Sequence, residues 1–417
     1  MKKALIAFFA VVMLTTLFTS CPGGGSAGGP VTLTVGIWDQ NQAPGIQQVL
    51  DDFTAETGIR TTLQVTPWGD YWTLLEAAAT GGALPDVMWM HSNQVQRYMA
   101  GGQLLDLTSR IQASNVANMA NFPRDIVDLY SRDGSQYGIP KDVDTIALWY
   151  NRRMFDAAGV SYPTNDWTWD DVLDAARRLS NPAAGQYGIV FFPPEVHTGY
   201  WNHVFQAGGY IISPDRRRSG FDNPSTIEAL EWVVNLTRQG LSPPLDHGES
   251  DMMALMTGEV VAMAQFGSWM LSAFKQSDFF IQNCDMVMLP SGPADRATIY
   301  NGLAWSAAAN TPYQEEAWRL LEYFSREDVQ TKLSVLGVAI SAYNGTAAPF
   351  VASFPEFNAI DYVDQLRYAV MRPWSINQLL WEDMSIRLLN DAWAGTRPVA
   401  DVAREIAQQM NAMLAAE

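Results

Sequence analysis

The sequence predicts an α/β protein built from two lobes, and three observations support this fold class. Strand-like and helix-like segments alternate from residue 31 onward. The chain of 417 residues is long enough for two domains, each with its own hydrophobic core. One strand-like stretch near the middle, residues 137–159, connects two such α/β regions, and we expect each lobe to hold a mostly parallel sheet flanked by helices.

The central stretch reads Y-G-I-P-K-D-V-D-T-I-A-L-W-Y-N-R-R-M-F-D-A-A-G. Gly138 and Pro140 punctuate its start, and residues 146–150 are apolar with a strong preference for strand. Between them, Asp142 and Asp144 lie on one face at strand spacing. Carboxylates at the edge of a buried strand between lobes indicate a ligand cleft, although each of the two could also only cap a turn.

The N-terminus has the pattern of a secretory signal peptide, residues 1–20. Lys2 and Lys3 precede an apolar run that is too short and wrongly flanked for a stable membrane span. Cys21 then follows small residues, and this arrangement resembles a bacterial lipobox, in which the cysteine is acylated. The alternative is an ordinary signal peptide with a bystander cysteine. Residues 21–30 are rich in glycine and are typical of a flexible tether.

Charge and composition exclude several classes of partner. A net charge of −18 predicts repulsion of nucleic acid and of anionic lipid, so any membrane contact should come through a lipid anchor alone. If Cys21 carries lipid, Cys284 has no partner for a disulfide. We expect no metal and no cofactor, because the four histidines are scattered. The 15 tryptophans would suit a cleft that stacks on sugar rings.

The first lobe begins as strand, helix, strand, helix, strand, at residues 31–37, 45–57, 59–66, 71–79 and 85–90. Such a series favours a parallel sheet with right-handed crossovers, whose ligand crevice lies at the carboxyl ends of the strands. The side chains that follow these three strands are therefore site candidates. They are Trp38, Asp39, Trp68, Ser92 and Asn93.

Further on, strands are predicted at 187–192, 260–266 and 286–289, and helices at 167–180, 225–239, 251–258, 313–324 and 328–336. Trp201 could stack on a ligand or pack under Pro193. Gly267 would let the backbone approach a ligand closely, with Trp269 offering a face beside it. The tail, residues 362–417, should be helical and pack on the second lobe, with an interruption at Arg372.

Several segments together resemble the extracellular solute-binding proteins that serve as sugar-binding components of ABC importers, of the maltose-binding type. They are G-I-R-T-T-L-Q-V-T-P-W-G-D-Y, A-T-G-G-A-L-P-D-V-M-W-M, the central stretch, M-T-G-E-V-V-A-M-A-Q-F-G-S-W-M and N-G-L-A-W-S-A-A-A-N. The resemblance covers nearly the whole chain after the leader. It implies a type II periplasmic-binding-protein fold with three hinge crossovers, the second near residues 301–305 and the third at residues 337–343.

The resemblance also implies an organisation and partners. The first lobe would comprise residues 31–141 with 300–338, and the second residues 142–299 with 339–417. The protein would be exported and lipid-anchored, bind a sugar or polyol as a monomer, and deliver it to the transmembrane subunits of an ABC permease. In this family the position of Trp269 commonly lines the sugar site. Arg372 aligns with an arginine that often touches ligand, although a surface salt bridge is the alternative.

We therefore expect twelve ligand-binding residues, with tryptophans walling the sugar ring and polar groups satisfying its hydroxyls. They are Trp38, Asp39, Trp68, Ser92, Asn93, Asp142, Asp144, Trp201, Trp269, Gly302, Trp305 and Arg372.

An exported glycoside hydrolase is the alternative function, because two carboxylates in an aromatic cleft could serve one. Asp142 paired with Asp39 or with Glu195 would be the candidates. The sequence has no phosphate-binding loop, no G-x-S-x-G elbow and no H-E-x-x-H motif. We therefore predict a binding protein with no catalytic residues.

Overall fold

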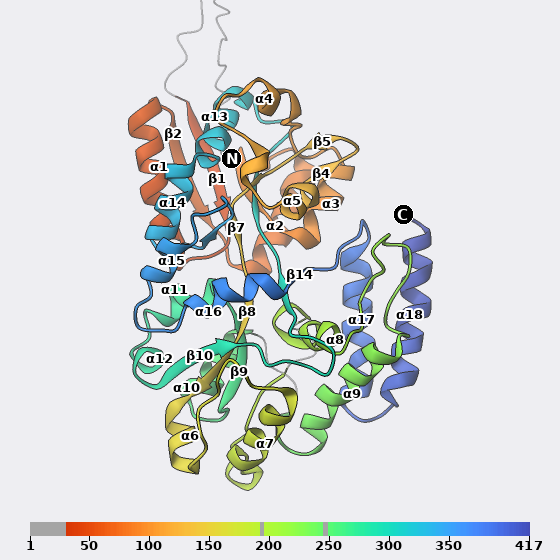
Figure 1. Cartoon of the computed structure of the whole chain (residues 1–417). Coiled ribbons are helices and arrows are strands. Elements are labelled where there is room, and N and C mark those ends of the chain that lie inside the picture. Colours follow the sequence, from red (N-terminus) through yellow and green to blue (C-terminus); the bar gives the residue numbers. More distant parts are fainter. Residues whose placement is uncertain (1–30, 192–195, 245–248) are drawn as a thin grey trace, which may run out of the picture.

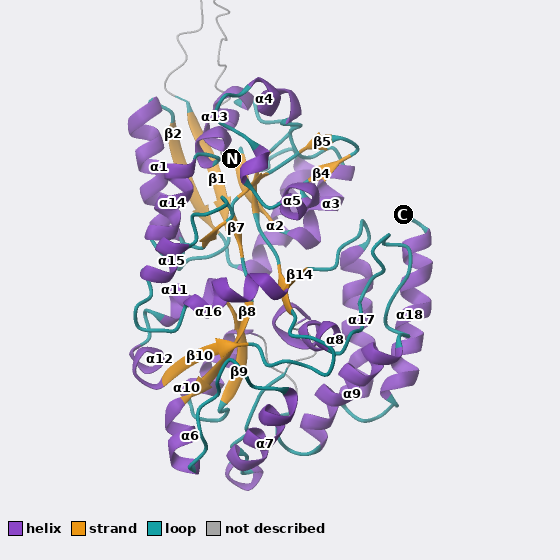
Figure 2. Cartoon of the chain, in the orientation of Figure 1, coloured by secondary structure: helices purple, strands orange, loops and turns teal. Residues whose placement is uncertain are grey.

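The computed structural model describes residues 31–191, 196–244 and 249–417. The predicted signal peptide and tether, with Cys21, and the candidate carboxylate Glu195 lie outside the described residues. Two α/β parts stand one above the other, with the chain passing between them (Figure 1). Each part has strands inside and helices around them (Figure 2). No helix in the described part of the chain is long and apolar enough to cross a membrane.

The first lobe is built on a five-stranded mixed sheet in the order β2-β1-β3-β12-β6. β1 is parallel to β2 and β3, whereas β12 is antiparallel to β3 and β6. The strands are β1 (Thr32–Ile37), β2 (Arg60–Val65), β3 (Val87–Met90), β6 (Ile139–Pro140) and β12 (Ala304–Ala307). Its helices include α1 (Ala43–Thr57), α2 (Trp68–Gly81), α3 (Ser92–Ala100), α4 (Thr108–Ala113), α5 (Arg124–Leu129), α13 (Gln314–Phe324) and α14 (Glu327–Val335).

The strand–helix alternation predicted for the start of the chain is confirmed. In α1 the side chains of Ile46, Val49, Leu50 and Phe53 are all buried, as their helical spacing indicates. Gly58 ends this helix with a φ of 74°, a left-handed conformation that glycine adopts without a steric penalty. The carboxyl ends of β1 and β3 consequently lead into the loops that hold Trp38 and His91.

The second lobe differs from the expectation of a mostly parallel sheet. Its sheet has the order β10-β8-β9, and both pairs are antiparallel. The strands are β8 (Ile146–Asn151), β9 (Met263–Gly267) and β10 (Cys284–Met288). β8 leads away from the junction of the lobes, whereas β9 and β10 start beside its far end, at Tyr150 and Asn151, and run back. Residues 187–191, where a strand was expected, form no regular strand, but they lie beside the start of β9 through a parallel bridge from Tyr187 to Val261 and a bond from the Val190 amide to the Met263 carbonyl at 3.1 Å.

Helices surround this second sheet, and the C-terminal helices pack beside it as expected. α18 contacts α9 and pairs along its length with α17, at the right of Figure 1. The helices are α6 (Arg152–Ala158), α7 (Trp169–Leu179), α8 (Trp201–Gln206), α9 (Pro224–Arg238), α10 (Glu249–Thr257), α11 (Leu271–Phe274), α12 (Asp278–Asn283), α16 (Ile360–Asp364), α17 (Gln378–Trp393) and α18 (Val399–Ala415). The short helix α15 (Ala348–Ala352) packs instead against α14 of the first lobe.

Three stretches of chain meet where the lobes join. β7 (Asp142–Val143) pairs with β13 (Ile340–Ser341), and the Asp144 amide donates to the Asn301 carbonyl at 2.9 Å. Just beyond this bridge, β11 (Thr298–Tyr300) pairs in parallel with β14 (Ala369–Met371). The junction is therefore a set of short paired strands, which fixes the residues that lie on it.

Acidification is expected to destabilise the second lobe through His203. Its ring is packed against Phe191, Trp169 and Trp232, and burial lowers the pKa of this imidazole to about 3. An unfolded histidine binds its proton near pH 6.5, so between pH 6.5 and 3 the unfolded chain holds one more proton. Stability should fall over this window by up to ~1.4 kcal/mol per pH unit. Urea unfolding at pH 7, 6 and 5 checks this expectation, and His203→Phe should show a weaker loss than wild type. An equal loss in both proteins would contradict it.

Candidate functional site

Four polar residues from both lobes meet at the junction, and we call His91, Asp144, His197 and Asn301 the junction cluster. His91 follows β3 in the first lobe, whereas His197 lies just before α8 in the second. His197 Nε2 lies 3.1 Å from Asp144 Oδ1, which also accepts from the Asn301 amide at 3.1 Å. Asn301 Nδ2 lies 3.2 Å from His91 Nε2. The cluster thus forms one polar surface that spans the two lobes.

His91 is held as a neutral ring. Burial lowers its pKa well below the ordinary value, and the charge of Arg372 lowers it further. Its Nδ1 lies 2.7 Å from Asn93 Oδ1 and accepts from the Asn93 amide at 3.2 Å, and its Nε2 lies 3.2 Å from Asn301 Nδ2. A neutral ring carries a proton on one nitrogen and a lone pair on the other. The pair therefore offers both hydrogen-bond donors and acceptors without a net charge.

Aromatic rings flank the junction cluster from both lobes. In the first lobe, the rings of Trp38 and Trp68 lie 6.3 and 5.2 Å from that of His91. Trp68 is 44% exposed, and Trp38 is half-buried. In the second lobe, the half-buried Trp269 lies with its ring 5.3 Å from that of His197. Polar groups between aromatic faces are the combination that a sugar ring requires, with its hydroxyl edge and its apolar face.

Gly267 places the Trp269 ring. A Cβ on this glycine would lie 2.0 Å from the indole, so the ring rests directly on the glycine backbone. We expected the absence of a side chain at Gly267 to let a ligand approach the backbone. In the structure the Trp269 ring occupies that space instead. The consequence for the site is that the indole is set in one position beside His197.

Several buried polar atoms near the junction find no hydrogen-bond partner among the described residues. They are Ser92 Oγ, Asn301 Oδ1, Arg372 Nε, one terminal nitrogen of Arg372, and Gln378 Oε1. Arg372 itself is 3% exposed, and its other terminal nitrogen donates to both oxygens of Glu382, at 2.9 and 3.0 Å. Buried donors and acceptors are normally satisfied, so a set of unpaired ones from both lobes indicates a polar ligand.

A second polar network fixes the loop that carries Trp38. Lys141 is buried, and its Nζ lies 2.5 Å from Asp142 Oδ2, 3.1 Å from Gln42 Oε1 and 4.2 Å from the centre of the Trp89 ring. Gln42 Nε2 in turn donates to Asp39 Oδ2 at 2.9 Å. One buried ammonium therefore holds the hinge carboxylate directly and the loop after β1 through an amide.

Nine of the twelve expected site residues lie at the junction cluster, close to it or in the Lys141 network. The structure brings Trp38, Trp68, Asn93, Asp144 and Trp269 to the junction cluster, and Ser92 and Arg372 lie close by with unpaired atoms. Asp39 and Asp142 serve the Lys141 network, with Asp142 Oδ1 also accepting from the Leu303 amide. Burial raises the pKa of Asp39, although the amides of Asn41 and Gln42 oppose this shift.

Three other expected residues are not brought to the site. Trp201 is fully buried between Arg372 and Trp381, with the guanidinium carbon 5.0 Å from its ring centre. Trp305 is fully buried against Phe324 at 4.1 Å between ring centres. Gly302 is required for close packing, since a Cβ there would lie 2.4 Å from the Asp142 carbonyl oxygen. All three residues are buried and present no surface to a ligand, so we do not include them in the proposed site.

The sequence reasoning missed His91, His197, Asn301 and Gln378. His91 follows β3 directly, just as Trp38 follows β1. The same strand-end rule that selected Trp38 could therefore have selected His91 as a site residue. His197, more than a hundred residues later, reaches Asp144 only through the fold. A spacing test for metal ligands could not find either, and the described residues contain no group of three or more that could hold a metal.

The geometry gives little support to the glycoside hydrolase. Asp142 is tied to Lys141 and to the Leu303 amide, while Asp39 accepts from Asn41 and Gln42. A catalytic acid needs a carboxyl group that is free to donate its proton to substrate, which neither of these arrangements provides.

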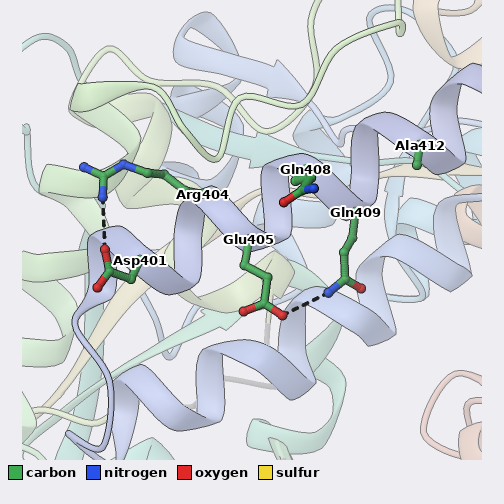
Figure 3. Close-up of a pocket in the computed structure, with 6 residues that line it drawn as sticks. All are labelled: Asp401, Arg404, Glu405, Gln408, Gln409 and Ala412. Atoms are coloured by element: carbon green, nitrogen blue, oxygen red, sulfur yellow. Dashed lines mark hydrogen bonds and ion pairs between the residues drawn. The ribbon is translucent and has the colours of Figure 1, made fainter.

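A wide hollow of about 640 Å³ lies elsewhere, along the outer face of α18 (Figure 3). All six of its lining residues come from this one helix. Arg404 donates to Asp401 at 3.1 Å, and Gln409 to Glu405 at 3.1 Å. These groups satisfy one another on an open helical surface, so we place no site there.

Comparison with known proteins agrees with this fold. The model of the bacterial extracellular solute-binding protein family matches residues 48–359. A lipoprotein of Streptomyces antibioticus is 24% identical over 348 residues, covering 78% of this chain and 74% of that protein. The maltodextrin-binding protein of Bacillus subtilis is 21% identical over 330 residues, covering 78% and 76%.

Among solved structures, an ABC substrate-binding protein from Listeria monocytogenes in complex with cycloalternan superposes with a TM-score of 0.84. It is 21% identical and covers 93% of this chain and 100% of that chain, which confirms the two-lobed architecture. With three quarters of its length matched by the family model, the chain belongs to the bacterial extracellular solute-binding proteins.

Proposed function

We propose that the chain is the extracytoplasmic substrate-binding component of an ABC importer. It captures a sugar or oligosaccharide between its two lobes and delivers this ligand to a membrane permease. The observation that carries the proposal is the junction itself, where unpaired buried polar atoms from both lobes lie among tryptophan rings. A relative named as a maltodextrin-binding protein and a structural neighbour solved in complex with cycloalternan support a carbohydrate as the ligand class.

The chemistry of the junction favours a neutral polyhydroxyl ligand. Arg372 is already paired with Glu382, and Lys141 with Asp142, so neither cation is free to neutralise an anionic substrate. Hydroxyl groups, which both donate and accept, can satisfy Asn301 Oδ1, Gln378 Oε1 and the free nitrogens of Arg372 together. Leaving these atoms unpaired is costly, so the ligand stabilises the closed arrangement of the lobes.

We assign ligand contact to the expected residues at the junction and to four others. They are Trp38, Trp68, Ser92, Asn93, Asp144, Trp269 and Arg372, with His91, His197, Asn301 and Gln378 added. Asp39 and Asp142 support them through Lys141. The lobes would be residues 31–141 with 300–338 and residues 142–299 with 339–417, closing about the paired strands of the junction.

Cys21 would carry a lipid anchor, which the similarity to a Streptomyces lipoprotein supports. The protein would act as a monomer, and the closed lobes would present one composite surface to the permease subunits. Binding shifts the population of closed molecules, and the proposal includes no catalysed reaction.

A ligand titration tests this proposal. A chain starting after Cys21 would be titrated with glucose, maltose, maltotriose, galactobiose and sorbitol, following tryptophan fluorescence and melting temperature. We expect saturation by at least one sugar and a higher melting temperature, because a ligand that binds only the folded state stabilises it. Chromatography of the incubated sugar should show no product. Hydrolysis would favour the glycosidase, and a folded protein that binds none of the panel would contradict the sugar assignment.

A further inference from the structure

The carboxylate of Glu382 contacts two residues of the proposed site. Both of its oxygens accept from one terminal nitrogen of Arg372, at 2.9 and 3.0 Å, and one of them also accepts from Gln378 Nε2 at 3.1 Å. Gln378 and Glu382 lie four residues apart in α17, so they share one face of this helix. One carboxylate therefore fixes two side chains that each keep unpaired polar atoms.

The ion pair between Arg372 and Glu382 is buried. Their side chains are 3% and 10% exposed, and the guanidinium carbon lies 5.0 Å from the centre of the Trp201 ring. Within the described part of the chain, Nε and one terminal nitrogen of the guanidinium have no hydrogen-bond partner. A buried charge without a counter-ion is costly, so Glu382 lets Arg372 offer these two donors without carrying a free charge.

Backbone contacts connect this ion pair with the junction cluster. The Arg372 amide donates to the carbonyl of Tyr300 at 2.8 Å, and Tyr300 directly precedes Asn301 of the cluster. α17 also packs against α3, the helix that begins with Ser92 directly after His91. The charge of Arg372 lowers the pKa of His91, so the guanidinium lies within electrostatic range of the cluster. A ligand at the junction would therefore experience the charge of this pair.

The charge that a ligand meets at the junction depends on Glu382. Lys141 is paired with Asp142, and Asp144 contributes a carboxylate to the junction cluster. A sugar acid placed there finds no free cation, so its carboxylate would lose water without compensation. Without Glu382, the guanidinium would be a free buried cation, and a guanidinium binds carboxylates through charge-assisted hydrogen bonds. A neutral sugar needs only hydrogen-bond donors, which the paired Arg372 already offers.

We infer that Glu382 is a specificity-determining residue: by neutralising Arg372 it makes the site accept neutral sugars and reject sugar acids. The inference rests on the proposed sugar-binding function, and it adds the charge of the substrate and the residue that selects it. Glu382 acts through Arg372 and Gln378, so it is a positioning residue, and its removal should change which ligand is preferred.

The test removes the charge of Glu382 and keeps its size. Wild type, Glu382→Gln and Glu405→Gln would be titrated by calorimetry, at constant ionic strength and neutral pH, with three pairs of compounds: glucose and glucuronate, galactose and galacturonate, and maltose and maltobionate. Glu405→Gln is the matched control, because it removes the same charge from a half-buried pair with Arg397.

In Glu382→Gln we expect the acids to bind about tenfold to a hundredfold more tightly than in wild type, the usual strength of a hydrogen bond to a charged group. The neutral sugars should not bind more tightly, because they carry no charge for the freed guanidinium. Glu405→Gln should match wild type with every compound. An equal gain for acids and neutral sugars in Glu382→Gln would contradict a role in charge selection.

Two further measurements separate charge from packing. Glu382→Asp keeps the carboxylate on a shorter side chain, so it should still reject the acids although its contacts to Arg372 and Gln378 are lengthened. Wild type tests the inference without any substitution, because it should bind each acid at least about tenfold more weakly than the neutral partner. Acids that bind wild type as tightly as neutral sugars do, or a folded Glu382→Gln that gains no affinity for them, would overturn the inference.

The proposed function and the role of Glu382 fail in different ways. If wild type binds neutral sugars and acids alike, the sugar-binding function stands and the role of Glu382 is wrong. If wild type binds no sugar, the proposed function is wrong, whereas acids that bind Glu382→Gln alone would still support its role. If none of the proteins binds any compound, both are wrong.

Discussion

Replacing Lys141 with methionine is expected to lower the free energy of unfolding by about 3–5 kcal/mol, the usual effect of breaking a buried ion pair. Its side chain is 1% exposed, and that of its partner Asp142 is 8% exposed. Methionine has a similar length and fills the space, so packing is largely kept. The carboxylate of Asp142 would remain buried without its cation, and the contact with the Trp89 ring would be lost. Urea unfolding of the soluble chain at pH 7 measures the change.

Two controls separate this effect from a general cost of losing a lysine. Lys332 forms an exposed pair with Asp52 across α14 and α1, and Lys332→Met should change stability by less than about 1 kcal/mol. The double variant Lys141→Met with Asp142→Asn removes both charges and keeps the oxygen that accepts from Leu303. It should be more stable than Lys141→Met alone. A single variant as stable as wild type would show that the pair contributes little to the fold.

The sequence predicted the first lobe well because its signals are local. The helix at residues 45–57 has an apolar face and a terminal glycine, and both features appear as expected in α1. The second lobe was predicted less well, since strand direction depends on connections that no local pattern records. β8, β9 and β10 were each placed close to their observed positions, but their antiparallel order follows from where the chain re-enters the sheet.

The candidate site shows the same limit in sharper form. Trp38 and Asn93 could be predicted from their positions after strands, because the carboxyl ends of neighbouring parallel strands meet at one edge of the sheet. His197 and Gln378 reach the junction through pairing between segments that are far apart in sequence, so no spacing rule could select them. The sequence also did not show which tryptophans are buried. Trp201 and Trp305 are fully buried in the cores, whereas Trp269 is partly exposed.

That difference makes Trp269→Ala the substitution with the largest expected effect on binding, a loss of more than tenfold in affinity, equivalent to about 1.4 kcal/mol. The half-buried indole stands beside His197 at the junction. In the proposed site its apolar face would cover a sugar ring, and Asp144 and His197 would bond the hydroxyls. Because the ring is only half-buried, the folded state should survive its removal. Calorimetric titration with the sugar that wild type binds gives the affinity, and circular dichroism confirms the fold.

Two further variants show whether the position of the ring matters as well as its presence. Gly267→Ala keeps the indole but places a methyl group where the ring now rests, so it should also weaken binding. Trp232→Ala removes another half-buried tryptophan of the second lobe, one that packs on Trp169 and His203 away from the junction. It should lower stability and leave affinity unchanged. Binding that is unaffected in a folded Trp269→Ala protein would remove this residue from the site. Equal losses in Trp232→Ala and Trp269→Ala would mean that binding reports the integrity of the lobe, because only a direct contact can distinguish two tryptophans of similar burial.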